Sequence, residues 1–192
     1  MYYTSDQLLT MMTRAWGFTH MPEDYHIIGI RSNLESREAN KFACTFHLFH
    51  GRKLVLSTSG TTVPGKPILL GGFKRFNKKG AAVLKSDVVY YDVWKYAGWL
   101  LGLKQLGAPV WVCRDGNLND KAEQTGIATK GWYGINFHTA TRNYLKNLII
   151  KLINGWSAGC QVANNTKDYR EIIKRCKDQD AVTYTLLDEF SV

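Results

Sequence analysis

The chain has 192 residues, a formal net charge of +9 and 45% hydrophobic residues, with 12% aromatic residues. This composition is typical of one globular domain with its own core, and it excludes a disordered or collagen-like chain. No apolar run reaches the ~18 residues that a membrane-spanning helix needs, and the first residues lack the basic and then apolar pattern of a signal peptide. We therefore expect no membrane insertion, synthesis in the cytosol, and attraction to polyanions without a specific nucleic-acid partner.

The predicted elements, taken in chain order, favour a mostly β fold with a few helices. Residues Ser5–Trp16 have the spacing of an amphipathic helix, with Ser5 as its N-cap. Strands are predicted at Tyr25–Arg31, Lys41–Phe49, Lys53–Ser57, Ala81–Leu84, Val88–Tyr91, Val110–Cys113, Trp132–His138 and Ala181–Leu187. An ordered loop is predicted at Ser57–Lys66, and further helices at Arg142–Asn154 and Asp168–Lys177.

No linker, internal repeat or low-complexity tract interrupts the chain. The sequence therefore predicts a single α+β domain over residues 1–192, in which residues 1–20 form an N-terminal helical extension.

Four cysteines are present, and no Cys-x-x-Cys pair predicts a structural zinc site. Three of them lie on apolar faces or runs and are typical of buried hydrophobic residues: Cys44, Cys113 and Cys176. Cys160 instead lies in Gly155–Val162, a stretch of small residues without a clear period. A thiolate that attacks a carbonyl needs open access and nearby N–H donors, which such a stretch can provide. At this point Cys160 is either a nucleophile or an incidental cysteine in a glycine turn.

A nucleophilic thiol also needs a base, because a free cysteine titrates near ~8.5. His138 ends an apolar strand and precedes two small residues, so it faces the kind of strand edge where sites form. A surface histidine remains the alternative interpretation. The other histidines flank turns and have no comparable setting: His20, His26, His47 and His50.

No metal or cofactor site is predicted. Asp115, Asn117 and Asn119 alternate like the first ligands of a calcium loop. However, Asp120 stands where the loop needs glycine, and Gly126 stands where it needs glutamate. A solvated turn is the better interpretation.

The strand ending in His138, followed by Ser157-Ala158-Gly159-Cys160, resembles the catalytic signature of the L,D-transpeptidase (YkuD-type) family. The segment Leu56–Gly65 resembles the upstream Ser-Thr-Gly and Thr-Pro-x-Gly segment of that family. Further stretches look like a branch common in bacteriophage genomes: Gly131–Val162, Val110–Asn117 and Thr183–Leu187. The resemblance covers a core of residues 41–190.

The resemblance implies a β-sandwich or barrel with short helices, and it implies roles for individual residues. Cys160 would be the acylated nucleophile, and His138 its base, oriented by a backbone carbonyl. Ser157 would shape the site, and the N–H groups of Gly159 and Cys160 would form an oxyanion hole. The substrate-binding residues would be Thr58, Ser59, Gly60, Trp156 and Gln161. Because the histidine precedes the cysteine, papain-like, CHAP and NlpC/P60 peptidases are excluded.

The activity implied is acyl transfer on peptidoglycan stem peptides. Val162 stands where the family usually has arginine or asparagine, and the spacing from His138 to Ser157 is slightly long. The acceptor therefore stays open: water would make the chain an L,D-carboxypeptidase or endopeptidase, and an amine a cross-linking transpeptidase. We expect a phage lytic enzyme that moves from the host cytoplasm to the cell wall or periplasm, or a virion-associated enzyme. The alternative is a non-catalytic virion or wall-binding module.

Overall fold

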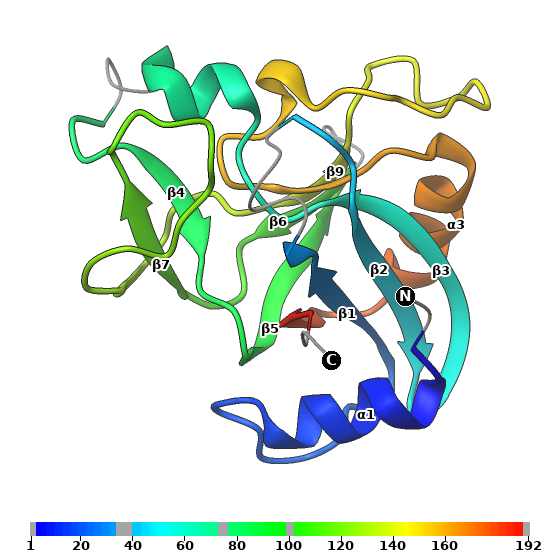
Figure 1. The fold of residues 1–192 in the computed structure, drawn as a ribbon. Helices are drawn as coiled ribbons and strands as arrows, with labels where there is room; N and C mark the ends of the chain where they lie inside the picture. Colours follow the sequence, from blue (N-terminus) through cyan, green and yellow to red (C-terminus); the bar gives the residue numbers. More distant parts are fainter. Residues whose placement is uncertain (1–2, 34–39, 73–76, 99–101, 190–192) are drawn as a thin grey trace.

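Among the described residues, eleven strands form one barrel and one smaller sheet. The barrel strands are β1 (Tyr25–Arg31), β2 (Cys44–His50), β3 (Lys53–Thr61), β5 (Val88–Ala97), β6 (Gly102–Gln105), β9 (Phe137–Thr139), β10 (Gln161–Ala163) and β11 (Val182–Asp188). The smaller sheet consists of β4 (Ala81–Leu84), β7 (Val110–Asp115) and β8 (Thr129–Gly131). The computed structural model describes residues 3–33, 40–72, 77–98 and 102–189. Around the barrel the order is β1-β11-β5-β6-β9-β10-β3-β2, and the smaller sheet has the order β4-β7-β8 (Figure 1).

Helices α1 (Ser5–Arg14) and α3 (Thr166–Cys176) cover different parts of the barrel. Helix α1 lies across its lower end in Figure 1. Helix α3 packs against β1, β3 and β9. Two shorter helical turns, η1 (Ile68–Gly72) and η3 (Asn154–Trp156), lie in the connections. Among the described residues, no helix combines the length and apolar character needed to cross a bilayer.

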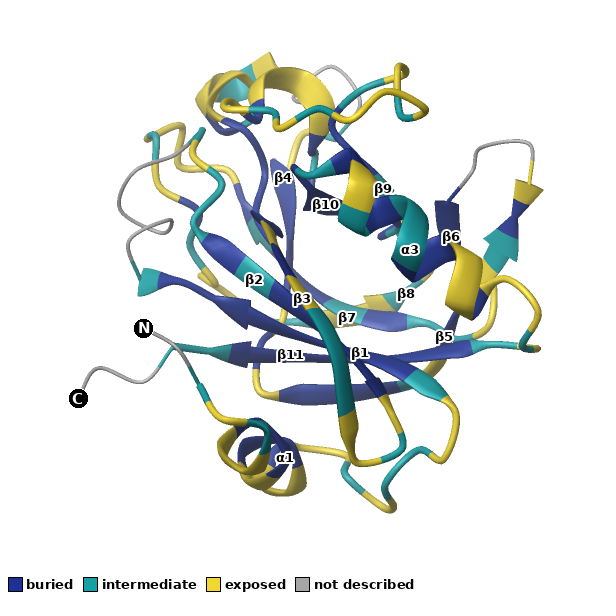
Figure 2. Cartoon of the chain, turned by 90° about the vertical axis from the view of Figure 1, so that its right-hand side faces the viewer, coloured by how far each residue is buried: buried dark blue, intermediate teal, exposed yellow. Residues whose placement is uncertain are grey.

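The core lies inside the barrel, where aromatic rings from several strands meet. Most strands are dark blue over much of their length in Figure 2, whereas β3 is largely teal and yellow, and the connections at the barrel ends are largely yellow. The Trp94 ring stacks on the Tyr184 ring with centroids 4.4 Å apart, and the Phe46 and Phe137 rings meet edge to face at 5.2 Å. Burial of these large rings is the main stabilising contribution, because each removes a large apolar area from water.

The mostly β, α+β fold class is confirmed, and several elements fall where the sequence predicts them. Strand β1 has the predicted bounds, and α3 and β11 differ from their predictions by one or two residues. Strand β3 continues to Thr61, so the predicted loop from Ser57 begins too early. Residues of this segment pair with β2 on one side and with β10 on the other, which explains why a Ser- and Thr-rich segment is extended.

The predicted helix at Arg142–Asn154 is wrong. This segment has no regular helix, and its backbone bonds reach distant residues: the Ile150 N–H donates to Asn164 O at 2.9 Å, and the Ile153 N–H donates to Asn40 O at 3.1 Å. The apolar side chains that suggested a helical stripe do not share a buried face, since Leu145 is 76% exposed and Ile149 70% exposed while Ile153 is buried. Tertiary hydrogen bonds therefore override the local periodicity.

Two smaller predictions also need correction. Only the last two residues of the predicted strand Trp132–His138 lie in a strand, because β9 begins at Phe137 and ends at Thr139. The backbone N–H groups of Tyr133 and Ile135 both donate to the Gln105 side chain at 3.0 Å, and not to a neighbouring strand. At the N-terminus, Thr4 caps α1 in place of Ser5.

Candidate active site

Strands β9 and β10 are parallel neighbours, and their register places the two predicted reactive residues on one face. Val162 pairs with His138, and Gln161 pairs with Phe137. Phe137 points into the barrel core, so Gln161 also points inward. Successive side chains alternate between the faces, and Cys160 therefore shares the outer face with Val162 and His138. Both Cys160 and His138 are partly exposed.

The structure places the His138 ring and the Cys160 thiol close enough for each group to shift the pKa of the other. The ring nitrogen Nδ1 of His138 lies 2.9 Å from the carbonyl oxygen of Thr139. A carbonyl can only accept, so Nδ1 carries the proton and Nε2 is left for the thiol. A backbone carbonyl thus holds the imidazole in the tautomer that a general base requires.

The electrostatics of this pair favour a thiolate and an imidazolium. Burial alone would raise the pKa of Cys160, but the hydrogen bond and charge of His138 outweigh burial and lower that pKa. Burial alone would lower the pKa of His138, and the hydrogen bond and charge of Cys160 outweigh it and raise that pKa. Each group therefore favours the charged form of the other. Such a pair provides a nucleophile near neutral pH.

The other three cysteines differ sharply from Cys160. Cys44, Cys113 and Cys176 are buried, as the sequence predicts. Burial raises the pKa of Cys176 to about 12 and also raises the pKa of Cys113. A thiol with a raised pKa is a poor nucleophile at neutral pH, so Cys160 stands apart in the chain.

Ser157 is fully buried and organises the bend that presents Cys160. Its hydroxyl accepts the N–H of Gly159 at 3.2 Å and donates to the carbonyl oxygen of Cys160 at 2.9 Å. One side chain therefore fixes the backbone on both sides of the sulfur-bearing residue. The same contact changes one expectation: the N–H of Gly159 is occupied by Ser157, so Gly159 does not offer it to an oxyanion in this structure.

Gly159 is required by the backbone of the bend. Its φ is +128°, a conformation that side chains other than glycine rarely adopt, and an added Cβ would lie 2.3 Å from Ala82 O. The residue thus lets the bend pass directly over β4.

Residues that the sequence did not single out complete the site. The Cys160 sulfur lies 3.4 Å from Gly134 O, and the Asn136 backbone helps to lower the pKa of Cys160. Lys104 on β6 contributes a nearby positive charge that lowers the pKa of both reactive groups. The Gln105 backbone N–H donates to Asn136 Oδ1 at 3.0 Å, which ties β6 to this segment. No local motif identifies these residues, because their contacts cross between strands.

Gln161 does not bind substrate from its position in the structure, contrary to the prediction. Its side chain is 0% exposed and points into the barrel, where Oε1 accepts the Tyr184 hydroxyl proton at 2.7 Å. The period-two alternation of a strand explains the error: the residue after an outward nucleophile must point inward.

The predicted substrate segment Thr58-Ser59-Gly60 also lies away from the reacting atoms. Thr58 is buried and donates to Asp168 on α3 at 3.0 Å, and an added Cβ on Gly60 would meet Val162 O at 2.4 Å. Ser59 is exposed, but its hydroxyl donates to Asn164 at 2.6 Å. Asn164 lies four residues after Cys160, so Ser59 is roughly 13 Å along the strands from the sulfur. These three residues therefore stabilise β3 in place of contacting a substrate at Cys160.

Trp156, the remaining predicted substrate residue, ends η3 and is 38% exposed. It stands on the surface in the connection that leads to Cys160.

No described residue cluster of three or more His, Cys, Asp or Glu side chains could hold a metal ion. In the suspected calcium loop, the carboxylate of Asp115 accepts the Glu123 N–H at 2.8 Å, and Asn117 and Asn119 cap local turns.

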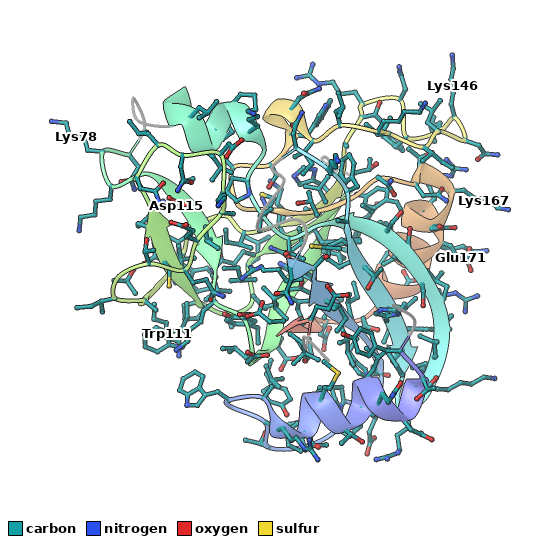
Figure 3. All side chains as sticks on the ribbon, in the orientation of Figure 1. Lys78, Trp111, Asp115, Lys146, Lys167 and Glu171 are labelled. Atoms are coloured by element: carbon teal, nitrogen blue, oxygen red, sulfur yellow. The ribbon has the colours of Figure 1, made fainter. Side chains whose placement is uncertain are left out.

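The stretch of chain that contains His138 and Cys160 is positively charged. No acidic residue occurs between Glu123 and Asp168, and this stretch carries Lys130, Arg142, Lys146, Lys151 and Lys167. Lys146 and Lys167 project outward near one another, whereas Lys78 projects from the opposite side of the molecule (Figure 3). The bond-making groups thus lie within a cationic stretch of chain, while some of the charge is spread elsewhere.

Comparisons of the chain with family models, with curated proteins and with solved structures returned no match.

Proposed function

We propose that this protein is a cysteine-dependent acyl-transfer enzyme of the L,D-transpeptidase type that acts on peptidoglycan stem peptides. The observation that carries the proposal is the juxtaposition of Cys160 and His138 on one partly exposed face of neighbouring strands, with His138 Nδ1 held by Thr139 O. This arrangement supplies a nucleophile, a base and an orienting group, which are the parts that thiol acyl transfer requires.

The proposed reaction has two stages. The Cys160 sulfur forms a bond to a peptide carbonyl carbon, and the carbonyl π electrons move to oxygen as an oxyanion. The oxyanion collapses, the C–N bond breaks, and His138 gives its proton to the leaving amine, which leaves a thioester. Water or an amine then attacks the thioester with His138 as base, and the thiol is regenerated.

The choice of substrate rests on the resemblance and on charge. The signature of His138 with Ser157-Ala158-Gly159-Cys160 is that of enzymes acting at the L-configured residue before D-Ala. The mostly β barrel is compatible with the fold of that family. The acid-free stretch between Glu123 and Asp168 favours an anionic envelope. We further propose a phage lytic role, in which the protein reaches the wall from the host cytoplasm or as a virion component.

The test is mass spectrometry of muropeptides after incubation of sacculi with the purified protein. We expect loss of D-Ala from tetrapeptide stems or opening of peptide cross-links, and no such change with Cys160→Ala. Cys113→Ala is the matched control, because Cys113 is a buried thiol outside the site. Unchanged activity in Cys160→Ala would remove the nucleophile assignment. Intact muropeptides with a correctly folded wild-type protein would leave only the wall-binding alternative.

The same experiment decides the acceptor. Added D-amino acid that is incorporated into stems would indicate an amine acceptor and a transpeptidase. Products shortened by hydrolysis would indicate water as the acceptor, as we expect for a lytic enzyme. In both cases Cys160 would carry the acyl group.

A further inference from the structure

We propose that Tyr184 and Gln161 form a buried relay that aims the backbone N–H of Cys160 at the oxyanion formed during acyl transfer. The relay rests on the proposed function, since it assigns a positioning role within that reaction. Neither residue contacts the substrate. Their effect passes through the peptide bond between Gly159 and Cys160.

Two hydrogen bonds link the barrel core to this peptide bond. The Tyr184 hydroxyl donates to Gln161 Oε1 at 2.7 Å, and Gln161 Nε2 donates to the carbonyl oxygen of Gly159 at 3.2 Å. Tyr184 is 1% exposed and Gln161 is 0% exposed, so water does not compete for these groups. A buried and satisfied chain of this kind is rigid, because breaking either bond leaves an unpaired polar group in the core.

Because the peptide bond is planar and trans, the hydrogen bond from Gln161 to Gly159 O also fixes the direction of the Cys160 N–H. The C=O of Gly159 and the N–H of Cys160 belong to one planar unit and point in opposite directions. Gln161 draws the C=O toward the barrel interior. The N–H of Cys160 must then point to the outer face, which is the face that carries the Cys160 sulfur and His138.

The other polar backbone atoms of the bend are already bonded. Ser157 occupies the N–H of Gly159 and the carbonyl oxygen of Cys160, and Gln161 occupies the carbonyl oxygen of Gly159. Within the part of the chain that the structure describes, no hydrogen bond uses the N–H of Cys160. This donor lies beside the nucleophilic sulfur, where a tetrahedral oxyanion would form.

The packing around Tyr184 holds its hydroxyl in place. The Trp94 ring stacks on the Tyr184 ring with centroids 4.4 Å apart. Gly29 leaves the space that the hydroxyl fills, because an added Cβ would lie 2.2 Å from the Tyr184 oxygen. Burial raises the pKa of Tyr184 well above its ordinary value, so the hydroxyl remains a donor. A donor at this point sets the amide of Gln161 with Oε1 toward Tyr184 and Nε2 toward Gly159.

The test compares two reactions of Cys160, of which only one forms an oxyanion. Acylation by p-nitrophenyl acetate forms an S–C bond through a tetrahedral oxyanion and releases p-nitrophenolate. Alkylation by iodoacetamide forms an S–C bond by direct displacement of iodide and forms no oxyanion. The variants are Gln161→Met and Tyr184→Phe, and Cys160→Ala gives the background. Tyr90→Phe is the matched control, because Tyr90 is buried opposite Tyr184 but donates to Lys85 O.

We expect Gln161→Met to lower the acylation rate about tenfold or more, while its alkylation rate stays within about twofold of wild type. Tyr184→Phe should lower the ratio of the acylation rate to the alkylation rate by a smaller factor, and Tyr90→Phe should leave this ratio unchanged. Thermal melting checks that each variant is folded, and Tyr184→Phe, which removes one oxygen atom, decides the matter if Gln161→Met does not fold.

The failures of the two proposals are distinguishable. Equal ratios of acylation to alkylation in wild type, Gln161→Met and Tyr184→Phe would overturn the relay and leave the proposed enzyme intact. A folded wild type that is alkylated at Cys160, is not acylated by the ester and does not alter muropeptides would overturn both.

Discussion

His138 lies directly opposite Val162 across the parallel strands β9 and β10. Val162 follows Cys160 by two residues in the chain, so His138 lies close to Cys160 in space. Neighbouring strands are held about 4.8 Å apart by their hydrogen bonds. The separation of His138 and Cys160 is therefore set by a sheet and not by a loop. Ser157 on one side and the Gly134–Asn136 backbone on the other fix the remaining freedom of the sulfur.

The pH dependence of Cys160 alkylation should report the lowered pKa of its thiol. The thiolate is present above that pKa, so the rate rises with pH and should reach half its maximum below the ~8.5 of a free cysteine. His138→Gln removes the group that lowers this pKa, so its profile should move to higher pH. His50→Gln, at an exposed position, is the control. The readout is the rate of iodoacetamide labelling, and an unshifted profile in His138→Gln would contradict the pairing.

Catalysis should also decline at high pH. The pKa of His138 is raised by its contact with Cys160, and above that pKa the ring loses the proton that the leaving amine needs. Acyl transfer to an amine-releasing substrate should thus follow a bell-shaped pH profile, whereas alkylation should only rise. A measured acyl-transfer rate that climbs steadily with alkylation would argue against His138 as the acid.

Gly159→Ala should destabilise the protein and remove activity. Alanine at φ +128° is strained, and its Cβ would collide with Ala82 O, so we expect a loss of about 3 kcal/mol or more in the free energy of unfolding. Gly155→Ala is the matched control, because no atom lies within 4 Å of an added Cβ there. Urea denaturation measures both. Equal stability of the two variants would show that the bend adapts to a side chain.

Acid should weaken the fold through His47. This ring is buried on β2, bonds to Ser57 and Thr45, and has its pKa lowered by burial to about 4. Between pH 6.5 and 4 the unfolded chain binds the proton that the folded chain excludes, so stability falls as the pH drops. The His47 contribution lost by pH 5 is about 2 kcal/mol.

The measurement for His47 is the difference in unfolding free energy between pH 7 and pH 5. His47→Gln should show a smaller difference than wild type, and His50→Gln should match wild type because His50 is exposed. Identical pH dependence in all three proteins would mean that His47 is not the group that titrates.

The start of α1 gives a test that separates the predicted cap from the observed one. The Thr4 hydroxyl accepts the Gln7 N–H at 3.2 Å, and the Gln7 side chain accepts the Thr4 N–H at 2.8 Å. Thr4→Ala should cost about 1 kcal/mol, whereas Ser5→Ala should change little. Chemical denaturation of both variants provides the comparison, and the reverse ranking would favour Ser5 as the cap.

Much of the fold can be predicted from the sequence because a strand or helix with one buried face has apolar residues at a regular spacing. The apolar run of β1 and the apolar stripe of α3 predicted these elements well. The helix predicted at Arg142–Asn154 is wrong because the helical spacing of leucine and isoleucine does not show that another element packs against them. In this segment the backbone bonds to Asn164 and Asn40, which are distant in the chain.

Some residues of the candidate site could be predicted from local sequence patterns, and others could not because they depend on contacts between distant strands. Cys160, His138 and Ser157 stand in short local patterns, and the structure brings these three together. Gln161 was assigned the wrong role, since its contact is with Tyr184 on a strand that pairs elsewhere in the barrel. Gln105 and Lys104 could not be found from β6 alone, because nothing in that strand marks its neighbour as β9.

The connection between β9 and β10 runs over residues 140–160, yet it does not determine how far apart the two strands lie. The exposed side chains of Leu145 and Ile149 in this connection can therefore change without moving the two strands, whereas Ile153 is buried and the backbone of Ile150 is tied to Asn164. These exposed positions can thus be redesigned to contact a different binding partner while the geometry of Cys160 and His138 stays as it is.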